Sequence, residues 1–427
     1  MKINIKIWQF ILALCLIIFI MHVTGYVDTI ILFLHLIKFL FTDYSFASGQ
    51  ITFQLIDVLI STTLIIAIPV FIYKIKNRKT ILNNKLNFTS ATIIILLFFF
   101  IFAPVIAVSN PDFQKNLRVT KLLPPMSVVH VLYLKSEIDG RDDKIVAFLK
   151  LKDEVVKKSF DNYIIFIDSL KQGQMVTYFQ NGEAHKIERE KIKYTSGAPL
   201  IKDRIFLLGT DEFGRDIFSR LVFGTRISMF VGFCAVVISL ILGLSFGFIA
   251  GFSSGTVDVL FNRFTDMLLA FPMVFLIILI LALFGNNLPA VIFVLGFSGW
   301  MSLFKIVRSE VISIKNKEYF ITSKMIGLSR INLLVKEVLP VIIASVIVNL
   351  VFQYGNVILA EAALSFLGLG TGSSYPSWGQ MIEAGQVYIT SAWWMIVFPG
   401  IILFLTLFAA YNFGREINEF FNPRIKI

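Results

Sequence analysis

Residues 318–340 read EYFITSKMIGLSRINLLVKEVLP, a polar and basic stretch between two long apolar runs. The upstream run covers about Leu288–Ile306, and the downstream run begins at Pro340. A membrane-crossing helix needs about 20 largely apolar residues, so the stretch is predicted to be a loop between two crossings. Its pattern predicts a short amphipathic helix, a turn near Gly327 and a second short helix that ends at Pro340.

The loop carries apolar side chains where a loop faces water. An apolar stripe on an amphipathic helix suits a partner's groove, and a helix lying on the lipid surface would account for it too. The apolar residues are Tyr319, Phe320, Met325, Ile326 and Leu328, interleaved with Lys317, Lys324 and Arg330.

The composition places the whole chain in a membrane. Of 427 residues, 56% are hydrophobic and 44 are Phe, and the mean hydropathy is +0.79. A soluble protein of this size cannot bury that much apolar surface. The formal charge of +11 comes from basic residues beside the apolar runs, which indicates cytoplasmic anchoring rather than nucleic-acid binding. Cys15 and Cys234 lie within apolar runs and imply no disulfide framework.

The first 90 residues contain three apolar runs. Those near Ile7–Val23 and Phe53–Tyr73 are predicted spans, the first of them an uncleaved anchor. Val27–Phe41 is shorter and carries His35 and Lys38, which favours a re-entrant or interfacial segment. The basic stretch YKIKNRKTILNNK that follows is predicted to be cytoplasmic.

Six further crossings are predicted, and counting them from the basic stretch gives the topology. Parity puts Asn110–Thr225 outside, and it puts both the loop before Pro340 and the tail Arg415–Ile427 inside. The crossings lie near Ala91–Val108, Ile227–Phe252, Val257–Phe284, Leu288–Ile306, Val341–Leu359 and Ala392–Phe413.

The insertion Asn110–Phe206 has the pattern of strands. VVHVLYLKS, KIVAFLKLK, NYIIFIDSL and MVTYFQN alternate apolar and polar residues, and turn signals stand at Asp139-Gly140 and Asn181-Gly182. A small β-rich domain outside the membrane is predicted. Its His130 and His185 lack the neighbours of a metal site.

No catalytic motif is present in the sequence. It has no G-x-x-x-x-G-K-[ST], H-E-x-x-H or G-x-S-x-G pattern. Asp258, Arg263 and Asp266 suit interfacial anchoring, and Glu361 is a candidate for a pathway. The bilayer centre lacks the acid–base chain of a proton-coupled carrier.

Leu208–Ile227 reads LGTDEFGRDIFSRLVFGTRI. We expect an amphipathic helix at the outer surface, with Asp211 as its N-cap, Glu212 in the first turn and an Asp216–Arg220 pair on one face.

With Ser228, the same segment resembles the signature before the second core span of the C-type permease subunit of oligopeptide, dipeptide and nickel ABC importers. Ile358–Ile382, Trp393–Gly414 and Asn422-Pro423-Arg424 are similar to later segments of that family. The resemblance covers Ala91–Ser109 and about Leu207–Arg424.

The resemblance implies an all-α polytopic membrane protein with a six-helix type I ABC importer permease core. Extra N-terminal spans and an inserted β-rich extracytoplasmic domain are added to that core. The implied domains are an N-terminal extension at 1–90, a first core span at 91–109, an insertion at 110–206 and the permease core at 207–427, with a cytoplasmic coupling loop at 308–339.

The family's importers carry an E-A-A-x-x-x-G loop that docks on the ATPase subunit. Aligned on Gly327 and Leu339-Pro340, the Glu-Ala-Ala positions hold Ile321, Thr322 and Ser323. Glu337 stands where the family commonly has His, Arg415 follows Gly414 where it usually has Asp, and the literal Glu361-Ala362-Ala363 lies on the extracytoplasmic side.

Two groups of site residues follow from the resemblance, and a third is chosen from polar residues in or just after an apolar span. The ATPase-coupling residues are Tyr319, Phe320, Ile321, Thr322, Ser323, Lys324, Gly327, Leu328 and Pro340. The extracytoplasmic signature helix contributes Gly209, Thr210, Asp211, Gly214, Arg215 and Asp216. Pathway candidates are Gln353, Tyr354, Asn356 and Glu361, although helix–helix hydrogen bonds explain these polar groups equally well.

The implied function is that of a transmembrane subunit in an ATP-driven importer for oligopeptides or dipeptides. The subunit would form half of the pathway and would perform no covalent chemistry, with no cofactor or metal. Its implied partners are a homologous permease, two ATP-binding subunits, an extracytoplasmic solute-binding protein and membrane lipid, in the bacterial inner membrane with a cytoplasmic C-terminus. The alternatives are a membrane sensor or assembly protein on the same scaffold, or a secondary carrier.

Overall fold

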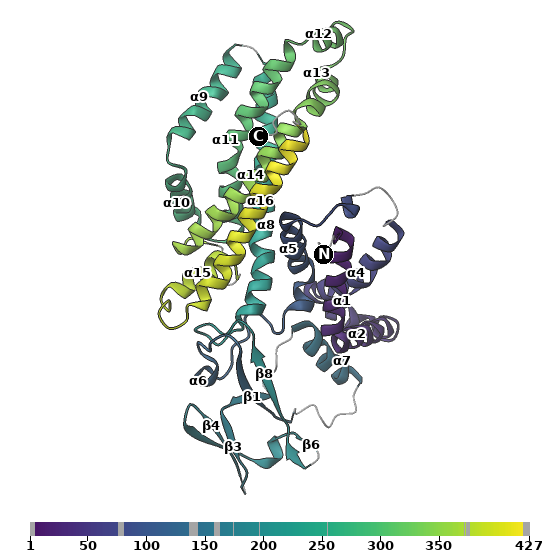
Figure 1. Ribbon diagram of the computed structural model, residues 1–427, viewed down its shortest axis with the longest axis vertical. Coiled ribbons are helices and arrows are strands. Elements are labelled where there is room, and N and C mark those ends of the chain that lie inside the picture. Colours follow the sequence, from purple (N-terminus) through teal and green to yellow (C-terminus); the bar gives the residue numbers. More distant parts are fainter. Residues whose placement is uncertain are drawn as a thin grey trace. The chain divides into compact units, whose positions relative to one another are not determined.

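A computed structural model describes residues 5–75, 81–135, 144–157, 163–173, 175–195, 197–253, 255–370, 372 and 376–421 (Figure 1). The predicted turn at Asp139-Gly140, the similarity at Asn422-Pro423-Arg424 and part of the basic stretch, 76–80, lie outside these residues. The chain divides into two compact units. Unit 1 comprises Met1–Asn87, Ile94–Arg226 and Ala384–Pro399, and unit 2 comprises Phe88–Ile93, Ile227–Glu383 and Gly400–Ile427.

Unit 1 begins with a group of apolar helices. Cys15, Tyr26, Ile65 and Phe102 are buried together where α1, α2, α4 and α5 meet. The elements are α1 Ile7–Met21, α2 Val23–Thr42, α3 Tyr44–Gln50, α4 Phe53–Ile75, a 3₁₀ turn at Ile81–Asn83, and α5 Phe88–Ile106.

Helix α2 is longer than the sequence pattern predicted. It covers 20 residues and is long and apolar enough to cross a membrane, so the expectation of a segment too short to span is wrong. The helix extends to Val23 and Thr42 because threonine, glycine and aspartate at its start are tolerated in a helix whose Leu32 and Leu36 are buried against α4.

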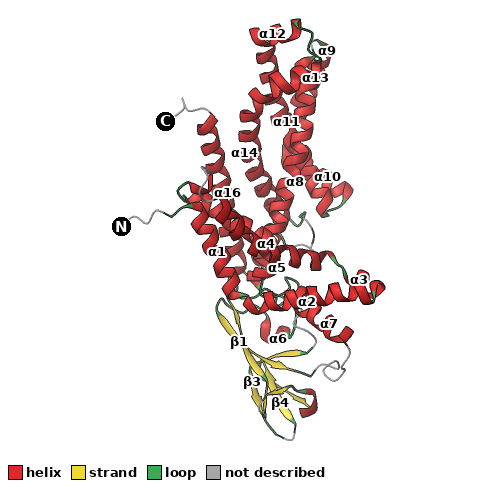
Figure 2. Cartoon of the chain, turned by 90° about the vertical axis from the view of Figure 1, so that its right-hand side faces the viewer, coloured by secondary structure: helices red, strands yellow, loops and turns green. Residues whose placement is uncertain are grey.

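The polar insertion holds the strands of unit 1, drawn in yellow in Figure 2. Two antiparallel three-stranded sheets have the orders β2-β1-β8 and β3-β4-β5, and β6 pairs with β7. The predicted turn at Asn181-Gly182 is confirmed, since both residues have positive φ between β4 and β5. The strands are β1 Ser127–Tyr133, β2 Ile164–Ile167, β3 Ser169–Lys171, β4 Val176–Gln180, β5 Glu183–Ile187, β6 Tyr194–Thr195, β7 Ala198–Pro199 and β8 Ile201–Phe206.

One predicted strand is a helix. KIVAFLKLK forms α7, Lys144–Lys152, followed by a π-turn at Asp153–Lys157. Phe148 is fully buried, and it packs with Val155 against apolar residues of α2, α3 and α4. As a helix, the segment can pack its apolar side chains against the surface of other helices. The apolar spacing of so short a run does not distinguish a strand from such a helix. The remaining short elements are α6 Leu117–Thr120 and a 3₁₀ turn at Arg189–Lys191.

Unit 2 is built mainly from long helices joined by short helical elements, and some of the long helices start or end in unit 1. They are α8 Ile217–Phe252, α9 Thr256–Ala270, α10 Met273–Phe284, α11 Leu288–Lys315, α12 Glu318–Met325, α13 Arg330–Leu333, a π-turn at Leu334–Val338, α14 Leu339–Phe366, α15 Trp378–Gln386 and α16 Trp394–Phe421.

The predicted crossing near Val257–Phe284 consists of two helices. Helices α9 and α10 meet at 88°. Pro272 disfavours helical geometry in the residue before it, and Phe271 accordingly has extended φ and ψ of −79° and 137°. The pair is a bent span or a re-entrant segment.

A glycine ladder brings α8 and α11 close together. A Cβ atom added at each of three glycines would lie 2.7–2.8 Å from a side chain of α11. The four-residue spacing is the small-xxx-small pattern of closely packed membrane helices. The pairs are Gly243 with Leu303, Gly247 with Val307 and Gly251 with Val311.

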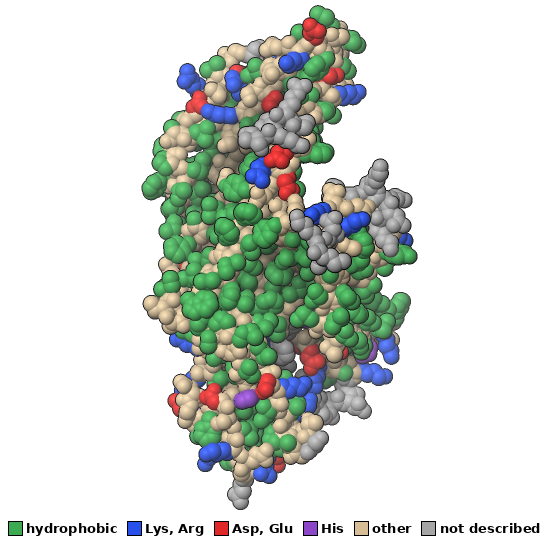
Figure 3. All heavy atoms as spheres, viewed as in Figure 1, with side chains coloured by type: hydrophobic (Ala, Val, Ile, Leu, Met, Phe, Trp, Pro, Cys, Tyr) green, Lys and Arg blue, Asp and Glu red, His purple; other side chains and the backbone are tan. Residues whose placement is uncertain are grey.

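The helices expose apolar side chains as membrane helices do. In the described part of the chain, seven helices are long and apolar enough to cross a membrane, and the bent pair raises this to eight if it is one span. Figure 3 shows hydrophobic side chains covering the helices on the face drawn. On α10, for example, Phe275, Leu283 and Phe284 are each more than two-thirds exposed (71%, 74% and 74%), a surface that suits lipid rather than water.

Candidate coupling loop and permease signature

The loop at residues 318–340, called the coupling loop below, is anchored in unit 2 by buried apolar residues. Phe320, Leu333 and Val338 lie in one core cluster, and the ring centroids of Phe320 and Phe252 are 6.1 Å apart. The prediction that Phe320 belongs to the exposed stripe is therefore wrong: only 4% of it is exposed. It holds α12 to the end of α8.

A Schellman motif ends α12 at the predicted turn. The amide of Leu328 donates to the Ser323 carbonyl at 3.3 Å, and the amide of Gly327 donates to the Lys324 carbonyl at 3.1 Å. Gly327 has φ +90°, which favours glycine. A Cβ there would meet nothing within 4 Å, so backbone conformation rather than space requires the glycine.

The second half of the loop, which begins with α13, leads directly into α14. The Ser329 hydroxyl caps α13 by accepting from the Asn332 amide at 3.3 Å. The π-turn at Leu334–Val338 then precedes Pro340 in the first turn of α14. Because proline lacks an N–H and crowds the preceding turn, this wider turn accommodates it.

The two halves of the loop are joined by a side-chain hydrogen bond. The Ser323 hydroxyl donates to Glu337 Oε1 at 2.9 Å. In the alignment expected from the resemblance, Ser323 takes the last Glu-Ala-Ala position and Glu337 the position where the family commonly has His. These two departures from the family pattern thus contact each other and hold α12 against the π-turn.

The side chains left on the surface of the loop form an apolar stripe. Each of these apolar side chains is more than 40% exposed. Helices α12 and α13 lie side by side at one end of unit 2 (Figure 1). Lys324 and Arg330 are exposed beside them. We define this apolar stripe as Tyr319, Ile321, Met325, Ile326, Ile331 and Val335.

Two ion pairs hold α9 against α11. Arg308 donates to both carboxylate oxygens of Asp258 at 2.5 and 2.6 Å, and the Lys305 ammonium donates to Asp266 at 2.5 Å. The structure thus gives Asp258 and Asp266 partners within the chain, in addition to any anchoring at the membrane interface.

The segment Gly209–Asp216, called the signature knot below, is a buried turn before α8 rather than a surface helix. Asp216 is the residue that caps α8, accepting from the Ser219 amide at 2.9 Å and the Ser219 hydroxyl at 2.5 Å. Asp211 instead closes the turn and accepts from Arg215 Nε at 2.6 Å. The predicted N-cap at Asp211 is wrong because the turn at Gly214 delays the helix.

Arg220 also has different partners from those predicted. Its guanidinium lies 3.6 Å from Asp211 and 3.3 Å from Asp112. The Asp216 carboxylate instead accepts hydrogen bonds from Ser219. A cap draws the carboxylate toward the helix axis, away from the residue four positions later.

Two glycines of the knot are required by space as well as by φ. A Cβ on Gly209 would lie 2.4 Å from the Leu123 carbonyl oxygen, and one on Gly214 would lie 2.1 Å from Thr120 Oγ1. Between them the fully buried Thr210 hydroxyl donates to the Thr120 carbonyl at 2.5 Å. Trp394 Nε1 donates to the Thr210 carbonyl at 3.1 Å, which ties the knot to the start of α16.

Burial shifts the ionisation of the knot. It raises the pKa of Asp216, against the opposing hydrogen bonds from Ser219. Burial, followed by the charge of Asp211, raises the pKa of Glu212. Outside the knot, burial lowers the pKa of Arg204 on β8, whose charge acts on Asp216. The charges of the knot are therefore held by one another rather than by water.

The pathway candidates divide into buried and exposed groups. Glu361 is fully buried and accepts from the hydroxyls of Ser365 at 2.8 Å and Ser228 at 3.4 Å. Gln353 is 9% exposed and fills the space beside Gly299, where a Cβ would lie 1.7 Å from its Nε2.

The other two candidates lie along the same helix. Tyr354 packs over Gly232, and Asn356 is exposed and accepts from the Tyr411 hydroxyl at 2.7 Å. All four candidates therefore contact neighbouring helices in this conformation: Gln353 and Glu361 are buried, Tyr354 is half-buried and Asn356 is exposed.

Sequence reasoning missed a polar network that joins the N-terminal extension to the permease core. Pro104 cannot donate to the Phe100 carbonyl one turn before it, and Arg226 Nε donates to that carbonyl instead, at 2.5 Å. Arg226 also donates to the Ile101 carbonyl at 2.8 Å and pairs through two nitrogens with Asp57 of α4. The sequence signal that could have revealed this network is the presence of two charged residues, Asp57 and Arg226, each near the start of a long apolar run.

Comparisons with known proteins identify one family. Residues 243–426 match the family described as the inner membrane component of binding-protein-dependent transport systems. The dipeptide permease DppC of Bacillus subtilis (strain 168) is 36% identical over 219 residues, which cover 51% of this chain and 68% of that protein. The chain belongs to this permease family.

Other relatives are of the same kind. DppC of Alkalihalophilus pseudofirmus is 37% identical over 218 residues, 51% of this chain and 72% of its own length. The oligopeptide permease OppC of Haemophilus influenzae is 35% identical over 229 residues, 54% and 73% respectively. A solved structure of the inward-facing MetNI methionine ABC transporter covers 47% of this chain and 97% of the matched chain, with a TM-score of 0.38 and 16% identity.

The predicted resemblance and fold class are confirmed. The permease is a multi-pass inner-membrane component of an ABC importer, mostly helical, with small sheets inserted between α5 and α8. Membership of this family implies that it works with permease and ATPase subunits.

Proposed function

We propose that this permease imports peptides, and that its coupling loop docks on a separate ATPase. The exposed apolar stripe, held in place by buried anchors, is the observation that carries the proposal. Names of the relatives support a peptide substrate, since they are dipeptide and oligopeptide permeases.

Docking rests on apolar contact rather than on an acid. The stripe occupies two short helices fixed by the Schellman turn and the Ser323–Glu337 hydrogen bond. A preformed surface with exposed apolar side chains suits a groove on a partner, since little conformational entropy is lost on binding. Lys324 and Arg330 beside it favour an acidic rim around that groove.

The other partners follow from the proposed topology. The coupling loop and the tail after Arg415 face the cytoplasm, and a homologous permease completes the pathway. The insertion 110–206 then faces the side from which a solute-binding protein delivers substrate, and we propose that it strengthens that encounter. Unchanged binding-protein affinity and uptake after deletion of Asn110–Asp203 would rule this role out.

A co-purification experiment tests the docking. Tagged wild-type permease, solubilised from native membrane, should recover an ATPase and a second permease. Gly327→Ala should recover the second permease with little ATPase, because a side chain at φ +90° disturbs the turn without any clash. Gly255→Ala is the matched control, because that glycine also has positive φ and open space but lies outside the loop. Equal ATPase recovery by both variants would contradict the docking surface.

A further inference from the structure

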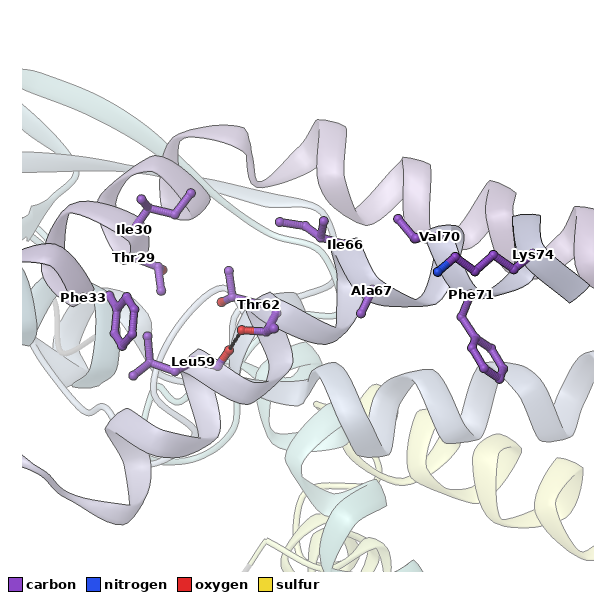
Figure 4. Close-up of a pocket in the computed structure, with 11 residues that line it drawn as sticks. Thr29, Ile30, Phe33, Leu59, Thr62, Ile66, Ala67, Val70, Phe71 and Lys74 are labelled. Carbon is purple, nitrogen blue, oxygen red and sulfur yellow. Dashed lines mark hydrogen bonds between the residues drawn. The ribbon is translucent and has the colours of Figure 1, made fainter.

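An apolar groove of about 540 Å³ runs between α2 and α4 of unit 1 (Figure 4). Ile30 and Phe33 line it from α2, and Ile66 and Val70 from α4. Its volume lies within the range of about 300–1,000 Å³ that small-molecule sites occupy. Both helices are long and apolar enough to cross a membrane, and such a position in the bilayer brings lipid to the groove.

The hydroxyl groups of the groove are already bonded to the helices that carry them. Thr29 donates to the Gly25 carbonyl at 2.6 Å, Thr62 to Val58 at 2.7 Å and Thr63 to Leu59 at 2.7 Å. Each bond reaches one turn back along its own helix. With these hydroxyls bonded to backbone, the walls offer an occupant mainly apolar contact.

The end of the groove differs from its walls. Among the described residues that line the groove, Lys74 alone has a charged side chain, and Figure 4 shows its ammonium directed back toward Val70 rather than beyond the helix end. A lysine at a helix end normally reaches out to the aqueous interface. Lys74 therefore places a positive charge at one end of the apolar groove.

We propose that the groove binds an anionic phospholipid from the surrounding bilayer. One acyl chain lies between α2 and α4, and the phosphate-bearing headgroup sits at Lys74. The occupant must be amphiphilic because the walls are apolar while the single charge stands at one end. It must be anionic because that charge is positive, and basic sites between membrane helices select such headgroups. A transmembrane helix from a partner would meet the walls but would leave the ammonium unneutralised.

Native mass spectrometry of the full-length chain in detergent tests this site. The chain is offered equal amounts of phosphatidylglycerol and phosphatidylethanolamine, which differ in headgroup charge. Wild type should retain mainly phosphatidylglycerol. Lys74→Gln should lower that preference about fivefold, the ratio expected for one lysine near a lipid headgroup. Lys38→Gln, at an exposed lysine of α2 outside the lining, is the matched control.

A second variant separates the groove from a general basic surface. Ala67 lines the groove and is exposed, so Ala67→Phe should fill it and lower retention of both lipids, while the thermal unfolding midpoint stays near that of wild type. Equal retention of the two lipids by wild type, or loss with Lys38→Gln to the same extent, would overturn the proposal. So would a photo-crosslinker at Ile66 that captures a protein in native membranes instead of lipid.

Discussion

The coupling loop and the signature knot both lie in segments that resemble motifs of the permease family, but the loop exposes apolar side chains whereas the knot buries polar ones. The loop presents apolar side chains at its surface and buries only its anchors. In the knot, Thr210, Asp211 and Asp216 are buried. Thr210 bonds to Thr120 and Asp216 to Ser219, whereas Asp211 bonds to Arg215 within the knot. A shared motif can therefore serve contact with a partner or the internal structure of the chain, and side-chain exposure distinguishes the two.

The largest expected effect tests whether the knot is structural. Gly214→Ala should destabilise the permease by about 2–5 kcal/mol, the sum of left-handed backbone strain and a clash with Thr120. Gly182→Ala has the same sign of φ but open space, so it should cost only about 1–2 kcal/mol. Thermal unfolding in detergent gives the comparison. Equal midpoints for the two variants would show that the knot relaxes around a methyl group.

Two neighbouring residues of the coupling loop should separate stability from docking. Phe320→Ala removes a buried anchor and should cost about 3–4 kcal/mol. Tyr319→Ala, at a 43% exposed side chain, should change stability by less than about 0.5 kcal/mol while reducing ATPase recovery. Unfolding midpoints and co-purification are measured on the same preparations. If Tyr319→Ala recovered as much ATPase as wild type but had a lower unfolding midpoint, Tyr319 would be a structural residue rather than a docking residue.

Asp57→Asn tests whether buried polar contacts also join the N-terminal extension to the core. The amide keeps one acceptor for Arg226 but loses the charge, so the expected cost is about 2 kcal/mol. Asp28→Asn, on α2 outside this network, should leave the unfolding midpoint unchanged. If both variants unfold at the same temperature as wild type, the extension is held by apolar packing alone.

The smallest effect concerns pH. The pKa of Glu212 is raised by burial and by Asp211, against the charges of Arg215 and Arg220. The folded state therefore binds a proton more tightly than the unfolded state, and this stabilisation is full at acidic pH and lost as pH rises through the raised pKa. Thermal unfolding of wild type compared with Glu212→Gln, from about pH 7.5 down to about pH 4.5, should show a gain at low pH that the variant lacks. A parallel gain in both would assign it to another group.

Much of the fold was predictable because its signals are local. Long apolar runs, the positive charges beside them and the glycine at the loop turn each act through neighbouring residues. The Asn181-Gly182 hairpin was predictable for the same reason. The break between α9 and α10 carried a local signal too, at Pro272, which the apolar run around it concealed.

The errors share a different cause. KIVAFLKLK alternates like a strand, yet Phe148 became helical to pack against α2 and α4. Asp211 looked like a cap, but the approach of Thr120 to Gly214 moved the helix start to Asp216.

The sequence by itself determined that this chain is a multi-pass membrane protein with a permease core and a turn at Gly327, because hydropathy, charge and φ are properties of short stretches. Only the tertiary structure decided that Phe320 is an anchor while Tyr319 is exposed, that Arg226 meets Asp57, and that Ser323 meets Glu337. Those outcomes depend on which distant backbone approaches a side chain, and a polar or aromatic group in a low-dielectric surrounding takes whichever partner that approach supplies.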